Sequence, residues 1–231
     1  MMNLLAIDTA TERLSVAVSC TGNHTWVFEA DAGLRHSELV MDSIDMLLKK
    51  AALKPEDLSG VVCMGGPGSF TGLRIGFSLA KGLALSLNIP FAAIPTLDCL
   101  SWPFSAWPGI VIPALDAKKE AFFCALYRSG KRLCPDMDAG SAEIARVIAD
   151  THEAEHILLT GPGASMLHEQ LNANAAASSL TESSMKLDIT AGKLRWGNAE
   201  TLLAIAQETR IIAHGDAGYS GGPEYGRGAI S

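Results

Sequence analysis

The stretch Gly65-Gly66-Pro67-Gly68-Ser69-Phe70-Thr71-Gly72 is the most informative segment of the sequence. It follows an apolar run, Val61–Met64, that predicts a buried strand, and it precedes Leu73–Leu87, whose pattern predicts a helix. A glycine-rich turn at the start of a helix offers backbone N–H groups and a positive dipole end, which suit a phosphate. The Gly-Lys-Ser/Thr of a Walker A loop is missing, however. The chemistry alone therefore favours a tight turn that brings the helix close to a sheet.

A second stretch, Ile157–Met166, repeats the order of strand, Gly-Pro-Gly turn and helix. The chain opens on alternating segments typical of a β-meander, and a 3.6-residue period at residues 36–52 predicts an amphipathic helix. We interpret the two halves as a duplicated α/β architecture. The expected divisions are an N-terminal lobe at residues 1–108, a C-terminal lobe at 109–213 and a glycine-rich tail at 214–231.

The composition is that of a globular protein, with 48% apolar and 19% charged residues among 231. The net charge of −7 is spread evenly along the chain, which argues against nucleic-acid binding by the chain alone. Five scattered cysteines contain no C-x-x-C pair, so they predict free thiols rather than a zinc site or a disulfide framework. No signal peptide or sufficiently long apolar run is apparent, and we expect a cytoplasmic protein without a membrane segment.

Three residues are candidates for binding a cofactor: Asp8, Asp116 and Gly68. Each aspartate follows or ends an expected strand, where it could bind a metal or phosphate or could cap an Asx-type turn. The two interpretations of each aspartate remain open on the sequence alone. No histidine occurs between His36 and His152, which argues against a zinc hydrolase. The sequence therefore predicts no metal ligand.

The helix expected at Leu73–Leu87 is unusual because its only charged residues are Arg74 and Lys81. A helix that is apolar nearly all round is buried on more than one face, either inside its own fold or against a partner. Small residues recur every four positions from Gly72 to Ala84, which allows another helix to approach closely. We predict that this helix and the one at residues 36–52 present an apolar partner surface. Its expected members are Leu39, Val40, Ile44, Leu47, Leu73, Gly76, Phe77, Ala80 and Leu83.

Several longer motifs resemble one protein family. They are Leu4-Leu-Ala-Ile-Asp-Thr-Ala-Thr11, Arg35-His-Ser-Glu38, Gly66-Pro-Gly-Ser-Phe-Thr-Gly-Leu-Arg-Ile-Gly76, Pro95-Thr-Leu-Asp98, Asp116-Ala-Lys-Lys-Glu120 and Thr160-Gly-Pro-Gly-Ala164. Together they resemble the bacterial tRNA threonylcarbamoyladenosine biosynthesis family TsaB, also called YeaZ. Near the end, Pro223-Glu-Tyr-Gly-Arg227 departs from the family's Pro-x-Tyr-Leu-Arg by a glycine. The resemblance implies an actin-like, sugar-kinase-like ATPase fold of the α/β class, with two ribonuclease-H-type lobes.

The same resemblance implies a function. The family is similar to TsaD, which transfers the threonylcarbamoyl group to tRNA and carries a His-x-x-x-His metal pair, whereas the corresponding stretch here, Thr96–Trp102, has no histidine. The resemblance therefore implies a non-catalytic scaffold that binds TsaD, assembles with TsaE and meets tRNA only through that complex. Because the apolar partner surface would be exposed without TsaD, we also expect the isolated chain to pair with a second copy through it. We expect no cofactor of the chain's own, and ATP or ADP binding near the partner interface stays open on the sequence.

Two other functions fit the same fold. An ATPase or ATP-dependent phosphotransferase would use Asp8, Asp116 and the glycine turns. A glycoprotease, an old label of this superfamily, is disfavoured because the metal-binding histidines are missing.

Overall fold

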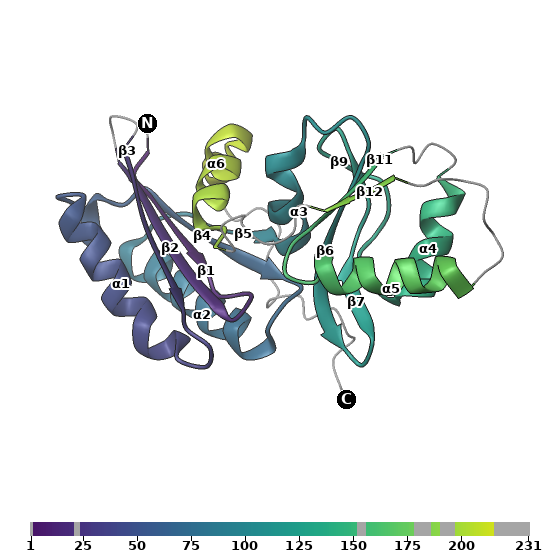
Figure 1. Cartoon of the computed structure of the whole chain (residues 1–231). Helices are drawn as coiled ribbons and strands as arrows, with labels where there is room; N and C mark the ends of the chain where they lie inside the picture. Colours follow the sequence, from purple (N-terminus) through teal and green to yellow (C-terminus); the bar gives the residue numbers. More distant parts are fainter. Residues whose placement is uncertain (1, 21–23, 152–155, 178–185, 190–196, 215–231) are drawn as a thin grey trace. The chain divides into compact units, whose positions relative to one another are not determined.

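The computed structural model describes residues 2–20, 24–151, 156–177, 186–189 and 197–214. Among these, the residues up to Cys99 and those from Gly197 onward form a first compact unit, and residues 100–189 belong to a second (Figure 1). The division thus falls before the expected boundary at 108, and the last helix belongs to the first unit rather than the C-terminal lobe. The reason is that this helix packs on the first sheet. The tail beyond residue 214 lies outside the described residues.

The first unit is built on a five-stranded sheet in the order β3-β2-β1-β4-β5. The central strand β1 pairs antiparallel with β2 and parallel with β4. The outer pairs are β2 with β3, antiparallel, and β4 with β5, parallel. The strands are β1 (Leu4–Asp8), β2 (Arg13–Cys20), β3 (His24–Asp31), β4 (Gly60–Gly66) and β5 (Phe91–Pro95).

Helices cover both faces of this sheet because successive side chains of a strand point to opposite faces. Leu5 and Ile7 join a core with the apolar side chains of α1 (His36–Lys50) and α2 (Phe70–Leu87). The alternate residues of β1, including Asp8, point to the other face, where α6 (Ala199–Thr209) packs on β1, β2 and β4. Figure 1 shows α6 on the side of the sheet away from α1 and α2.

The remaining elements of the first unit are short. They are η1 (Pro55–Asp57), η3 (Ile211–His214) and the start of α3 (Thr96–Ser101), whose last two residues belong to the second unit.

The second unit repeats the first in topology. Its main path runs β10-β7-β6-β11-β12, with the central strand β6 antiparallel to β7 and parallel to β11. This is the strand order of the first unit, so the duplication expected from the two Gly-Pro-Gly turns is confirmed. The strands are β6 (Ile110–Lys118), β7 (Ala121–Cys124), β8 (Tyr127–Arg128), β9 (Lys131–Arg132), β10 (Met137–Gly140), β11 (His156–Thr160) and β12 (Lys186–Ile189).

The helices of the second unit are η2 (Trp102–Phe104), α4 (Ser141–Asp150) and α5 (Ala164–Ala177). The sequence predicts a loop at residues 172–185, but α5 continues into this range and β12 follows it. The alanine-rich composition favours a helix once it can pack, and β12 gains its stability by pairing with β11. In the described part of the chain, no helix has the length and apolar character that a bilayer crossing requires.

The predicted partner surface is largely interior. Two of its nine residues, Leu39 and Leu83, are partly buried and pack against the core of the first unit. The other seven are buried in the protein: Val40, Ile44, Leu47, Leu73, Gly76, Phe77 and Ala80. These side chains therefore do not form the exposed apolar face that the sequence predicts, because the sheet already covers them.

Candidate functional site

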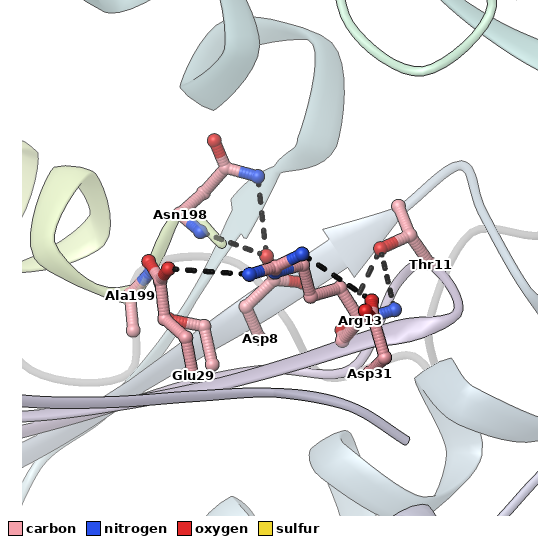
Figure 2. A network of polar contacts seen from close by, with 8 residues as sticks. Asp8, Thr11, Arg13, Glu29, Asp31, Asn198 and Ala199 are labelled. Carbon is pink, nitrogen blue, oxygen red and sulfur yellow. Dashed lines mark hydrogen bonds and ion pairs between the residues drawn. The ribbon is translucent and has the colours of Figure 1, made fainter. Parts of the chain in front are cut away.

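Asp8 lies at the centre of the main polar network of the first unit (Figure 2). Its carboxylate is fully buried and accepts three hydrogen bonds from the protein itself. Oδ1 accepts from the backbone N–H of Ala10 at 2.9 Å, which closes an Asx-type turn. Oδ2 accepts from both the backbone N–H and the side-chain Nδ2 of Asn198, each at 3.1 Å. The turn is one of the two interpretations that the sequence left open for Asp8.

Burial raises the pKa of Asp8 above its ordinary value, because removing a carboxylate from water disfavours the charged form. The hydrogen bonds from Ala10 and Asn198 and the nearby His36 act in the opposite direction without outweighing burial. The same burial raises the pKa of the Cys63 and Cys99 thiols, and the charge of Asp8 adds to this effect. The environment of Asp8 therefore suppresses the reactivity of both neighbouring thiols.

The glycine turn after β4 is filled by the chain itself. A Cβ at Gly68 would lie 2.6 Å from the backbone oxygen of Ala10, and one at Gly72 or Gly76 would collide with Thr9. The hydroxyl of Thr9 donates a hydrogen bond to the carbonyl of Gly72 at 2.7 Å. The glycines are thus needed so that α2 can approach the end of β1, which is the tight-turn interpretation of this motif.

Three backbone amides around the start of α2 have acceptors within the protein. The N–H of Ser69 bonds to the carbonyl of Ala10 at 2.7 Å, and that of Leu73 bonds to the carbonyl of Ser69 at 2.8 Å. The Ser69 hydroxyl accepts from Gly72 N–H at 3.3 Å and caps the helix. These three amides therefore already have hydrogen-bond acceptors within the protein.

Asp116 lies in β6 of the second unit and is partly exposed. Its Oδ1 accepts from the backbone N–H of Lys118 at 2.7 Å, and its Oδ2 pairs with the Lys118 ammonium at 2.9 Å. The side-chain hydrogen bond from Lys118 is the main reason that the pKa of Asp116 is lowered. Both oxygens are therefore used in the hairpin turn that joins β6 to β7.

The described residues hold no cluster of three or more histidine, cysteine, aspartate or glutamate side chains that could bind a metal. The five cysteines are free thiols, as the sequence predicts. His152, one end of the histidine gap, lies outside the described residues.

The residues around Asn198 and on β2 and β3 complete the polar network around Asp8, and no sequence pattern predicts this role for them. The pattern at Asn198–Glu208 predicts a last helix, so Asn198 stands at its start. Its backbone and side-chain N–H groups donate to Asp8, while Ser15 accepts from Ala199 N–H at 3.4 Å. Arg13 lies between Glu29 at 3.9 Å and Asp31 at 3.3 Å (Figure 2). Only the helix-start signal at Asn198 was available in the sequence.

The comparisons with known proteins agree with this architecture. A family model described as "TsaD: tRNA N6-adenosine threonylcarbamoyltransferase" matches residues 29–209. The structure of YeaZ from Pseudomonas aeruginosa superposes with a TM-score of 0.75 at 23% identity, covering 97% of this chain and 100% of that one. The structure of a putative N-acetylmannosamine kinase from Listeria monocytogenes superposes with a TM-score of 0.50 at 13% identity. This match covers 90% of this chain and 100% of that one.

The relatives found by sequence identify the family more specifically than the structural neighbours do. The tRNA threonylcarbamoyladenosine biosynthesis protein TsaB of Bacillus subtilis is 33% identical over 176 residues, which cover 74% of this chain and 75% of that protein. The Escherichia coli protein of the same name is 34% identical over 131 residues, or 55% of each chain. The match thus spans about half the length of the E. coli relative.

The duplicated sheet and these neighbours define the class: an α/β protein with the actin-like, sugar-kinase-like fold, related to the tRNA threonylcarbamoyltransferases. Within that class the chain belongs to the TsaB family.

Proposed function

We propose that this chain is a non-catalytic subunit in the cytoplasmic synthesis of threonylcarbamoyladenosine in tRNA, and that it binds and supports TsaD. Its relatives carry the name of that biosynthesis. The observation that supports the non-catalytic role is the hydrogen bonding of Asp8 to residues of the chain itself. This buried carboxylate, which an ATPase of this fold would need for its cofactor, accepts three hydrogen bonds from the chain's own residues.

The outward side of α2 is the surface that best suits a partner. It exposes Phe70 by 51% and Leu85 by 73%, and the Arg74 guanidinium lies 3.7 Å from the ring centre of Phe70. The neighbouring α1 adds two partly exposed methionines, Met41 and Met46. Exposed apolar side chains on two helices that pack against each other suit a protein interface. The proposed surface therefore keeps the predicted helix pair but uses its outward residues.

Capture of TsaD by variants of the chain tests this surface. We expect Leu85→Glu to weaken binding by about tenfold or more, because it places a charge in a contact that excludes water. The matched control is Leu133→Glu, which changes a leucine exposed by 48% in the second unit and should leave binding unchanged. Both variants should unfold near the wild-type temperature. If folded Leu85→Glu binds TsaD as wild type does, the α2 surface is the wrong one.

Self-pairing and TsaE binding are further parts of the proposal. A two-fold dimer of the isolated chain would reuse the α2 surface on both copies. Sedimentation should then show that Leu85→Glu is monomeric, while Leu133→Glu stays dimeric. TsaE and tRNA should be captured only when TsaD is present, because the net charge of −7 gives this chain little attraction for phosphates.

The ATPase alternative makes the opposite prediction for the isolated chain. A turnover of ATP that Asp8→Asn abolishes would favour a phosphotransferase or ATPase and contradict the non-catalytic role. ATP or ADP held only in the complex with TsaD would agree with the proposal, because the cofactor is then expected near the partner interface.

A further inference from the structure

We infer that Asp8 and Ser15 form a clasp that fixes the N-terminus of α6 to the sheet of the first unit. The two residues are direct cross-strand neighbours on β1 and β2. Both accept hydrogen bonds from the first residues of α6 and its N-cap: Asp8 from Asn198, and Ser15 from Ala199. Figure 2 shows Asn198 directed at Asp8 from the start of the helix.

The chain leaves little room for a side chain where it enters α6. A Cβ at Gly197 would lie 2.6 Å from the Cβ of Ser15 and 2.7 Å from Oε1 of Glu29. A larger residue at this position would require the side chains of Ser15 and Glu29 to shift. The glycine therefore brings Asn198 within hydrogen-bond distance of Asp8, and the ion pairs between Arg13 and its two acidic neighbours lie beside it.

The chemistry of the clasp suits the end of a helix. The first amides of a helix have no acceptor within it, and its N-terminus carries a partial positive charge. A carboxylate accepts hydrogen bonds from such amides, and its negative charge complements the positive end of the helix. Three N–H groups donate hydrogen bonds to the carboxylate of Asp8. The Sγ of Cys99 adds a weak contact, 3.8 Å from the carbonyl oxygen of Asn198.

The clasp matters because α6 reaches the first unit from far along the chain. Asp8 and Asn198 are 190 residues apart. Closing such a long loop costs conformational entropy, and the contacts that hold the returning segment must offset this cost. Leu202, Leu203 and Ala206 of α6 are buried, so losing the clasp would loosen the cover of this sheet face. Asp8 is thus a positioning residue for α6, independent of whether TsaD binds.

Hydrogen exchange of the full chain tests the clasp. In Asp8→Asn, a donor of the new amide must face either Ala10 N–H or the two donors of Asn198. We expect the amides of residues 202–206 to exchange about 10- to 100-fold faster, the effect of losing hydrogen bonds to a charged group. The amides of α2 should change much less. Asp116→Asn, the matched control in the second unit, should leave both helices unchanged.

Two further variants keep the inference falsifiable if Asp8→Asn fails to fold. Asn198→Ala removes only the side-chain donor, and it should speed exchange in α6 more than in α2. The reciprocal double variant, Asp8→Asn with Asn198→Asp, restores one donor–acceptor pair and should recover part of the lost protection. Equal acceleration of both helices in Asn198→Ala, or no recovery in the double variant, would overturn the clasp.

Discussion

The two units share a strand order and a Gly-Pro-Gly turn, yet they use their central aspartates differently. Asp8 and Asp116 both lie toward the end of the central strand of their sheet, and both accept a hydrogen bond from the N–H two residues on. Asp8 is buried and binds the start of α6, whereas Asp116 is partly exposed and binds Lys118 of its own hairpin. The same local turn thus serves long-range packing in one unit and a surface hairpin in the other.

The glycine turns of the two units also differ, in the space that their glycines leave for a side chain. Gly68, Gly72 and Gly76 approach the segment after β1 too closely for any side chain. In the second unit, a Cβ at Gly161 would also come close, 2.8 Å from the backbone oxygen of Ala114, but one at Gly163, just before α5, would lie 3.1 Å from backbone atoms of Ala114 and Asp116. The two units therefore differ at the start of the following helix, where Gly72 leaves less room for a side chain than Gly163.

The largest effect on stability should come from a charge placed in α2, the helix that follows the glycine turn of the first unit. Ala80 of α2 is completely buried, so Ala80→Glu leaves an unpaired charge in the core and should cost about 3 to 5 kcal/mol of unfolding free energy. The corresponding test in the second unit is Met166→Glu on α5, where the side chain is partly exposed and about 0.5 kcal/mol is expected. Chemical denaturation measures both. A stable, dimer-deficient Ala80→Glu would show that α2 is less embedded than described.

The next effect compares the two turns directly. Gly72→Ala forces a methyl group into the backbone of Thr9 and should destabilise the protein by about 3 kcal/mol. Gly163→Ala meets its neighbours at the limit of contact and should cost about 1 kcal/mol. Thermal unfolding of the two variants under identical conditions decides the order, and equal shifts would remove the proposed difference in packing.

Replacing the two central aspartates should give stability losses that differ less from each other than those of the two preceding pairs of variants. Asp8→Asn disturbs a fully buried set of hydrogen bonds and should reduce the unfolding free energy by about 2 kcal/mol. Asp116→Asn weakens a partly exposed pair with Lys118 and should cost about 0.5 kcal/mol. Urea titration of both variants provides the measurement; a larger loss for Asp116→Asn would reverse the assignment of roles.

The smallest effect is a difference in pH dependence. The folded-state pKa of Asp8 is raised above 3.8, so the folded protein holds this proton where the unfolded chain has lost it. Its contribution to stability therefore falls as the pH rises from the unfolded value through the folded pKa. The pKa of Asp116 is lowered, so its contribution is present above the unfolded value and is lost as the pH falls through the folded pKa.

Unfolding free energies measured at several pH values would separate the two aspartates. Relative to Asp8→Asn, the wild type should lose stability with rising pH, and relative to Asp116→Asn it should gain stability. Slopes of the same sign in the two comparisons would contradict the opposite pKa directions.

The sequence by itself determined the features that depend on neighbouring residues. The alternation in β2, the glycine turn before α2 and the helix that starts beside Asn198 all follow from local patterns. The two Gly-Pro-Gly turns also indicated the duplication. The strands β9, β10 and β12 were missed, because they are stabilised by pairing with other strands.

Only the tertiary structure decided which side chains are covered. Helical periodicity showed that α1 has an apolar face and that α2 is apolar nearly all round, but it could not tell whether a sheet or a partner covers Val40 or Ala80. It likewise gave no sign that Asn198 would meet Asp8 across 190 residues. Periodicity reports the faces of one element, whereas burial and long-range hydrogen bonds depend on which distant element packs against that face.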